Sequence, residues 1–542
     1  MESSPKKRIL DHFLTEPRET TPTTTIDYTY GKSDHNPVIA RWPIPQAPRP
    51  TGMPTKRMNH KLLLAKADQI RRTNFFAPLL EFIHDDDPEQ LASVLADASW
   101  KAAEETECIS ISKPGSTKKR KRRTSNKSKG LIRKRNRLLK KWLEDQTPEN
   151  LQEFQRTSKE TKKSLQEDAK TRVTNFHMKI GDSLATGEGS DGAWKTINSC
   201  IGRSNTKTEI KELENIATKE TANTEEGVGE ALFEHYKLLF SDNENFNSID
   251  WDSVPIEQEE TELPGINEPI TWSELSSCIK KLGKGKSPGP DGVVSELYMT
   301  ATRTSDPELK AQIETQPVCD LGRSLLGLAQ MIWRTGKFPR CWDAAVIVSI
   351  PKKPGSTKPG DYRGISLIQT ISKLMTSILA KRILKGLLQT DRLCKEQAGF
   401  RSFEEGIAQA TLVYELVTRA QESNKTSYIT FIDAEKAFDR APRGAIIAKA
   451  RAIGVRGRAL QLIENLYQHA SFKVRNGNYL SDIGAVEKGV KQGCPLSPIL
   501  FCIFMNDLNQ AIQTNAPNLG HSLYPRGPQI TAGKFADDVA MI

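Results

Sequence analysis

The most constraining feature of this chain is a pair of adjacent aspartates, Asp537 and Asp538, inside a short apolar segment. The segment reads Lys-Phe-Ala-Asp-Asp at residues 534–538 and continues as Val-Ala-Met-Ile. Two short apolar runs around a polar pair are typical of a β-hairpin with the acids at its turn. Adjacent carboxylates raise each other's pKa, so the pair is stable only beside water or a cation. Taken alone, the segment is also compatible with an ordinary turn, where aspartate is common.

A second acidic site precedes the hairpin in the chain. Residues 427–431, Ser-Tyr-Ile-Thr-Phe, read as a buried strand, and Asp433 follows near its end, before a helical pattern. Carboxylates from both sites would offer oxygen ligands to hard divalent cations such as Mg²⁺ or Mn²⁺. Two ions in such a site catalyse in-line phosphoryl transfer. The sequence therefore predicts that Asp433, Asp537 and Asp538 are catalytic residues that hold two metal ions.

Three segments resemble, in order and spacing, the core palm motifs of reverse transcriptases of non-LTR (LINE-like) retrotransposons. They are Phe-Ile-Asp-Ala-Glu-Lys-Ala-Phe-Asp at residues 431–439, Gln-Gly-Cys-Pro-Leu-Ser-Pro-Ile-Leu-Phe at 492–501 and Phe-Ala-Asp-Asp at 535–538. The resemblance covers about residues 210–542. It implies an α+β fold of fingers and palm, in which helices pack on an antiparallel palm sheet. It also implies an RNA-directed DNA polymerase whose partners are an RNA template, a DNA primer or target, and dNTP.

The resemblance assigns roles around the incoming nucleotide. It implies that Lys352 and Arg363, on a fingers hairpin, face the triphosphate, where an arginine fork suits phosphate geometry. Phe438 stands at the position of a steric gate that collides with a 2′-hydroxyl, and Gln492 and Gly493 would lie along the nascent base pair. A surface cation is the alternative for Lys352 and Arg363, and a core aromatic is the alternative for Phe438.

Four further positions are interpreted in the same way. The Gly- and Pro-rich loop at residues 284–292 is expected to follow the template strand, with Lys284 and Lys286 near phosphates. Gly364 stands where the family usually has proline, which is expected to loosen that turn. Asp439 is interpreted as a structural hydrogen-bonding or capping group and not as a metal ligand.

Local patterns predict several elements of the fingers and palm. Thr271 and Glu274 form a capping box at the start of a helix over residues 271–282. Apolar spacing predicts helices over residues 227–240 and 365–388. A strand is expected over residues 343–350. Asn476-Gly477 is a favoured two-residue turn and predicts a hairpin over residues 471–480.

A dense basic run precedes the polymerase-like region. Residues 118–141 contain 14 Lys or Arg in 24 positions. One sign of charge at this density suits a phosphate backbone, although a nuclear-localisation signal or a solvated face is also compatible with it. The consecutive cations predicted to contact nucleic acid are Lys118, Lys119, Arg120, Lys121, Arg122 and Arg123. Trp100 and Trp142 flank the run and are expected to pack in a core, not to stack on bases.

The N-terminal residues carry a separate resemblance. The segment with Ser33, Asp34 and His35 is similar to the last motif of the endonuclease/exonuclease/phosphatase fold, which such retroelements carry upstream of the polymerase. There the histidine contacts the scissile phosphate and the aspartate orients it; a surface turn is the alternative. Some forty residues cannot bury the core of that fold. We therefore expect a remnant without nuclease activity.

These patterns predict a domain order. It runs as an endonuclease remnant (1–42), a Pro-rich linker (43–56), a basic, mostly helical and partly disordered region (57–210), an N-terminal extension with the start of the fingers (211–330), and fingers with palm (331–542).

Composition limits the class and the compartment. A net charge of +11 and a pI near 9.1 favour a polyanionic partner, nucleic acid before membrane. The eight cysteines form no C-x-x-C pair, which argues against zinc fingers and suits a reducing compartment. The sequence shows no apolar run of about 20 residues and no signal peptide at its start. We therefore expect an intracellular protein, in the nucleus or cytoplasm of its host.

The predicted function is reverse transcription by a non-LTR retroelement enzyme with two Mg²⁺ or Mn²⁺ ions. A relic that binds nucleic acid with weak or no synthesis is the alternative, since the sequence ends four residues after Asp538. The resemblance implies further palm motifs and a thumb beyond that point, so slow, distributive synthesis is expected. A group II intron maturase shares the palm motifs, but the segment around Asp34 and His35 argues against it.

Overall fold

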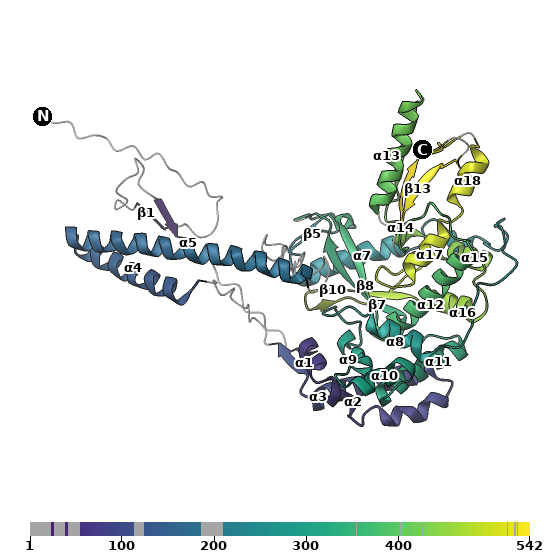
Figure 1. Cartoon of the computed structure of the whole chain (residues 1–542), viewed down its shortest axis with the longest axis horizontal. Helices are drawn as coiled ribbons and strands as arrows, with labels where there is room; N and C mark the ends of the chain where they lie inside the picture. The colour runs from purple at the N-terminus through teal and green to yellow at the C-terminus, as the bar shows by residue number, and fades with distance from the viewer. Residues whose placement is uncertain are drawn as a thin grey trace. The chain divides into compact units, whose positions relative to one another are not determined.

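The computed structural model describes residues 23–26, 38–41, 55–112, 124–185 and 210–542, apart from positions 354, 402, 403, 405, 425, 518, 525, 526 and 528. Contacts divide the chain into two compact units, residues 1–55 with 112–119, and residues 56–111 with 120–542. In the first unit, strands β1 (Thr23–Ile26) and β2 (Val38–Arg41) pair antiparallel. The second unit holds most of the described helices and strands (Figure 1).

The second unit mixes helices and strands, which confirms the α+β class. Its described helices are α1 (His60–Ala65), α2 (Ala67–Arg71), α3 (Pro88–Glu105), α4 (Asn126–Glu144), α5 (Pro148–Ala185), α7 (Glu225–Phe240), α8 (Trp272–Lys280), α9 (Ser295–Met299), α10 (Pro307–Thr315), α11 (Asp320–Thr335), α12 (Thr370–Gln389), α13 (Gly406–Glu422), α14 (Ala437–Arg440), α15 (Arg443–Ala452), α16 (Gly457–Gln468), α17 (Ser497–Phe504) and α18 (Leu508–Asn515). Short 3-10 helices are η1 (Ala77–His84), η2 (Phe246–Ser248), η3 (Thr300–Thr302), η4 (Arg340–Trp342) and η5 (Pro359–Asp361). The strands are β3 (Thr55–Met58), β4 (Ile109–Ser112), β5 (Leu213–Glu214), β6 (Thr221–Ala222), β7 (Ala344–Pro351), β8 (Tyr362–Leu367), β9 (Thr430–Asp433), β10 (Ser471–Asn476), β11 (Tyr479–Leu480), β12 (Gly484–Ala485), β13 (Ala532–Phe535) and β14 (Asp538–Met541).

Two sheets carry the predicted functional segments. The larger has the order β11-β10-β7-β8, with β12 also paired to β10; β7 and β10 run parallel, and β7 and β8 form an antiparallel hairpin. The smaller has the order β13-β14-β9 and is antiparallel throughout. The antiparallel sheet expected for the palm is therefore present, with the hairpin strand β14 at its centre.

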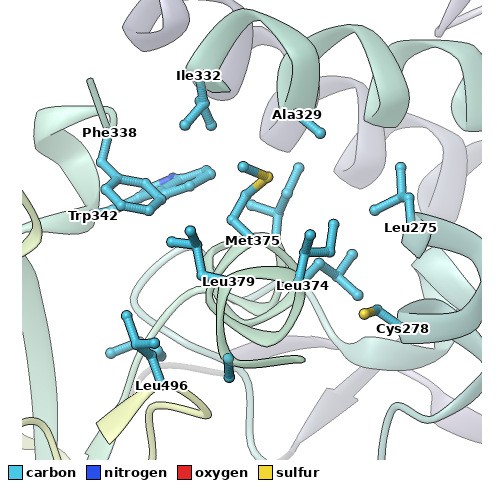
Figure 2. Close-up of a cluster of buried hydrophobic side chains, with 14 of the residues drawn as sticks. Leu275, Cys278, Ala329, Ile332, Phe338, Trp342, Leu374, Met375, Leu379 and Leu496 are labelled. Atoms are coloured by element: carbon cyan, nitrogen blue, oxygen red, sulfur yellow. The ribbon is translucent and has the colours of Figure 1, made fainter. Parts of the chain in front are cut away.

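One large hydrophobic core holds the second unit together around α12. Leu374, Met375 and Leu379 on this helix pack between α8 and α11, as Figure 2 shows with Leu275 and Ile332 from those helices. Apolar residues recur on α12 at helical spacing, and most of them are buried. The same core includes residues of α1 to α3 and of α15 to α17. It therefore joins segments far apart in the sequence.

Helix α7 covers the larger sheet. Its buried Leu232, Tyr236 and Phe240 pack against Ile347 of β7 and Phe472 of β10. Its bounds confirm the amphipathic helix predicted over residues 227–240. This packing fixes the base of the β7–β8 hairpin.

Helices α4 and α5 form a separate antiparallel pair. They pack side by side along α4 (Figure 1), with Trp142 stacked on Phe154 at 6.4 Å between ring centroids. Trp100 instead lies on the core of the unit, where its indole Nε1 donates to Asp291 O at 2.9 Å. Trp100 therefore packs on the core as expected, whereas Trp142 packs against α5 and lies in none of the hydrophobic clusters of the described residues.

The structure corrects two local predictions and confirms a third. The helix expected from residue 365 begins at Thr370, because residues 365–367 continue β8 and pair with β7. The hairpin turn is centred on Gly477 and Asn478, since Asn476 still pairs with Tyr479. The capping box of Thr271 and Glu274 is present as predicted, at the start of α8.

Among the described residues, no helix has the length and apolar character needed to cross a membrane.

Candidate active site

The three predicted carboxylates come together on the smaller sheet. Asp433 is the last residue of β9, and Asp538, the first of β14, is its direct antiparallel partner. Directly opposed residues in such a pair have Cα atoms about 4.5–5.5 Å apart. Asp537 lies in the turn between β13 and β14, beside Ala536. The hairpin with acids at its turn is therefore the structure that the sequence pattern predicted.

The carboxylates repel one another. Partial burial, and then the charges of Asp537 and Asp433, raise the pKa of Asp538 above its ordinary value. A divalent cation would relieve this repulsion, and an all-oxygen donor set suits Mg²⁺ or Mn²⁺. Within the described part of the chain, however, no three or more His, Cys, Asp or Glu side chains already form a group that could hold an ion. The ligand chemistry fits a metal, while the side chains do not enclose a ready-made site.

The burial predicted for the strand before Asp433 is wrong. Strand β9 begins at Thr430 and is exposed along its length, with Phe431 at 75% and Tyr428, just before it, at 82% exposure. The reason is its position at the edge of a three-stranded sheet, where β14 is its hydrogen-bonded neighbour. Aromatic and β-branched residues predicted the strand correctly, but burial depends on neighbours that propensity does not reveal.

The predicted gate residue follows on the short helix α14. The ring of Phe438 stacks on that of Phe501, with centroids 4.6 Å apart, and meets Phe400 edge-on at 6.1 Å. Phe438 is partly buried, so one part of its ring belongs to the core. This packing suits both interpretations of the residue, a gate and a core aromatic.

Asp439 and Gln492 contact each other directly. Gln492 Nε2 donates to Asp439 Oδ2 at 3.1 Å, and burial raises the pKa of Asp439 to about 6, against the attraction of Lys436 and Lys352. Asp439 thus has the hydrogen-bonding role that was expected. Gln492 also accepts, through its carbonyl O, from Ser366 N of β8 at 2.7 Å. The loop of Gln492 therefore lies against the fingers hairpin.

The fingers cations stand at the end of that hairpin. Lys352 and Arg363 are exposed, and Lys352 N donates to Asp361 O at 2.7 Å across the hairpin. Lys352 is close enough to Lys436 to help lower the pKa of that amine, after the larger effect of burial. The hairpin thus brings a predicted phosphate-binding lysine near the segment that follows Asp433.

Gly364 does not loosen a turn, as had been expected. It lies within β8 opposite Ser349, and a Cβ on it would be 2.7 Å from the ring of Tyr236. The hydroxyls of Tyr236 and Ser349 are hydrogen-bonded at 2.9 Å. The glycine is therefore needed to let α7 approach the hairpin closely.

Two residues that contact each other near the site were not identified from the sequence. Lys436 Nζ lies 3.1 Å from His235 Nε2 of α7, and burial, with the charge of Lys436, lowers the pKa of His235 to about 4. His235 is thus a neutral acceptor at physiological pH. Lys436 could have been noticed within the segment at residues 431–439, whereas His235 gave no signal beyond its place on an amphipathic helix.

The remaining predicted residues lie elsewhere or are not described. Lys284 and Lys286 are exposed on the loop between α8 and α9, and this loop packs at Gly289 against the backbone of Ile368 and Gln369. That neighbourhood is the start of α12, not the strands that carry the carboxylates. Asp34, His35 and residues 118–123 lie outside the described part of the chain.

Comparison with known proteins finds similarity to reverse transcriptases. Residues 350–542 match the family model described as reverse transcriptase (RNA-dependent DNA polymerase). The probable RNA-directed DNA polymerase from transposon BS of Drosophila melanogaster is 26% identical over 436 residues, which cover 77% of this chain and 43% of that protein. The RNA-directed DNA polymerase from mobile element jockey of Drosophila funebris is 28% identical over 281 residues, 51% of this chain and 27% of that protein. The chain thus spans less than half the length of these relatives.

Proposed function

Residues 350–542 belong to the reverse transcriptase family, and on that premise we propose that the chain is an RNA-directed DNA polymerase of a non-LTR retroelement. The single observation that carries the proposal is the placement of Asp538 directly opposite Asp433, with Asp537 in the adjoining turn. In the proposed reaction a primer 3′-hydroxyl attacks the α-phosphate of a dNTP. A new phosphodiester bond forms, and the bond to pyrophosphate breaks.

The chain's own residues bind and orient the reactants in this proposal. Asp433, Asp537 and Asp538 would hold two divalent ions, which, when bound, activate the hydroxyl and stabilise the leaving group. Lys352 and Arg363 are exposed on the fingers hairpin, and they would bind the triphosphate.

Other residues would bind the bases, the sugar and the template. Gln492 and Gly493 would lie along the nascent pair, and Phe438 would exclude a 2′-hydroxyl. Lys284 and Lys286 would contact template phosphates. The RNA template and the DNA primer are the partners that this function requires, and we propose action in the nucleus or cytoplasm of the host.

A nucleic-acid-binding protein without synthesis is the second candidate, and the surface of α4 favours it. Seven Lys and Arg of this helix are exposed, which gives the helix one dominant sign of charge. Such a surface binds phosphate backbones whether or not the carboxylates catalyse anything. The polymerase would need the three aspartates for synthesis, whereas a protein that only binds nucleic acid would not need them.

Primer extension on an RNA template, with dNTPs and Mg²⁺, separates the two candidates. Asp433→Asn and Asp538→Asn each remove a charge and keep the side-chain shape, so extension should fall at least about a hundredfold while binding of template persists. The matched control is Asp482→Asn, which makes the same change at an exposed aspartate of another segment. Chelation of Mg²⁺ should stop extension, and added Mn²⁺ should restore it. Extension by either site variant at the rate of the control would refute the assignment.

A further inference from the structure

Residues 396–399 run alongside the hairpin that carries Asp537 and Asp538. Lys534 N donates to Glu396 O at 2.9 Å, and Ala398 N donates to Lys534 O at 2.9 Å. These two bonds make a short parallel pairing between Gln397 and Lys534 on β13. The outer strand of the hairpin is therefore fixed by a segment that contributes no carboxylate of the site.

The side chain of Gln397 is bonded to the turn itself. It is 1% exposed, and its Oε1 accepts from Ala536 N at 3.0 Å and from Gly399 N at 2.9 Å. Its Nε2 donates to Ala536 O at 3.2 Å. One buried amide thus satisfies both backbone groups of the residue that precedes Asp537, and leaving them unpaired would be costly.

Ala536 needs this support because its backbone is in the left-handed region, with φ of 60°. Residues with a Cβ rarely adopt that conformation, and they keep it where surrounding contacts impose it. Gly399 completes those contacts, since a Cβ on it would be 2.2 Å from Ala536 N. The turn conformation is therefore held from outside the hairpin.

We propose that Gln397 is a positioning residue for the carboxylates, holding Ala536 in its left-handed conformation and thereby fixing where Asp537 and Asp538 stand. The inference rests on the proposed function, because it assigns the carboxylates to cation binding. Without the amide, the peptides on either side of Ala536 can rotate. Asp537 then leaves its place beside Asp538, and the affinity for divalent cations falls.

The test replaces the amide and measures cation binding directly. Gln397→Met keeps the length of the side chain and removes all three hydrogen bonds. We expect Mn²⁺ binding, followed by electron paramagnetic resonance without substrates, to weaken about ten- to a hundredfold, the usual effect of losing a residue that orients ligands. The Mg²⁺ concentration for half-maximal extension should rise by a similar factor, while KM for the template-primer stays unchanged.

A matched control separates positioning from general stability. Gln369 is another buried glutamine, 4% exposed, whose Nε2 donates to Cys341 O at 2.6 Å next to α12. Gln369→Met should lower the urea midpoint, as Gln397→Met does, without changing Mn²⁺ affinity. Ala536→Gly in the Gln397→Met background should recover much of the affinity, because glycine adopts positive φ without strain.

Two results would overturn the inference, and neither is the result that overturns the proposed function. Unchanged Mn²⁺ affinity in Gln397→Met would show that the amide does not set the carboxylates. Equal weakening in Gln369→Met would show that any loss of stability has the same effect. If Asp433→Asn has already abolished extension, either result leaves the polymerase assignment in place. If Asp433→Asn neither slows extension nor weakens Mn²⁺ binding, the proposed function itself fails.

Discussion

Asp439 is a buried carboxyl near the site whose pKa lies close to neutrality. Burial raises its pKa to about 6, although Lys436 and Lys352 attract its charged form. The folded protein therefore binds this proton more tightly than the unfolded chain does, for which the ordinary pKa is about 3.8. The contribution of Asp439 to stability is present below that ordinary value and is lost as the pH rises through about 6.

Asp439→Asn should remove this pH dependence and keep a side-chain oxygen that accepts the hydrogen bond from Gln492. Relative to wild type, the variant is expected to gain stability between pH 5 and pH 8, because the wild-type carboxyl must ionise in a buried place. Urea unfolding at the two pH values measures the difference. If the free energies of unfolding of the two proteins differ by the same amount at both pH values, Asp439 titrates as an ordinary aspartate.

A substitution at Phe438 tests whether the choice between deoxyribose and ribose depends on this aromatic side chain. Phe438→Val removes the ring but keeps an apolar side chain, so incorporation of ribonucleotides should rise on the order of ten- to a hundredfold relative to dNTP. Phe504→Val is the control, since Phe504 belongs to the same cluster, 6.0 Å from Phe501 between centroids. Equal discrimination by wild type and Phe438→Val would assign Phe438 to the core alone.

At the scale of elements, local signals predicted the bounds of hairpins and capped helices well. The pattern around Asp537 and Asp538 predicted β13 and β14, and Thr271 with Glu274 predicted the start of α8. The predictions failed where contacts between segments distant in the sequence determine the local structure. The register between β7 and β8 extends the strand through Leu367, inside an apolar pattern that also suits a helix. No local pattern indicated the role of Gln397, because its partner Ala536 lies 139 residues away in the chain.

Helix α4 has a cationic face that its sequence pattern and its packing together define. The apolar Leu131, Leu138 and Trp142 recur at helical spacing and are partly or fully buried. The exposed cations fall on the remaining surface of the helix, and they are Lys127, Lys129, Arg133, Lys134, Arg137, Lys140 and Lys141. A face of this kind can follow a phosphate backbone along the helix axis.

Changing Arg133, Lys134, Arg137 and Lys141 to glutamine should weaken binding of RNA or DNA and flatten its salt dependence. Each lost phosphate contact lowers the slope of log K against log salt by roughly 0.7–0.9. The control changes Lys159, Lys162, Lys163 and Lys170 of α5, which are exposed on a helix with interspersed acids. Binding is measured by fluorescence anisotropy at several salt concentrations. If both variants change the slope equally, net charge and not the face of α4 is responsible.

At the scale of the whole second unit, the first helices belong to the body that carries the fingers. His60 Nδ1 lies 2.7 Å from Glu296 Oε2, and Cys341 N donates to Glu89 Oε1 at 3.1 Å. Leu91 and Leu95 of α3 are buried in the same core as α11. The domain boundaries drawn from composition stay predictions, because composition reports local polarity. It cannot report contacts between residues more than 200 positions apart, such as these.

Removal of the first helices should therefore destabilise the rest of the second unit. A chain that begins at residue 124 loses α1 to α3 and η1, which together cover parts of α9, η3 and α11. We therefore expect binding of a hydrophobic dye and loss of cooperative unfolding. A chain that begins at residue 55 keeps those helices and should unfold like the full chain. Leu95→Ala makes the same test without deletion, since this side chain is 1% exposed and its truncation should cost about 2–5 kcal/mol. Urea unfolding followed by tryptophan fluorescence measures all three. If the chain from residue 124 unfolds with an unchanged midpoint, α1 to α3 are an independent part and not a wall of the core.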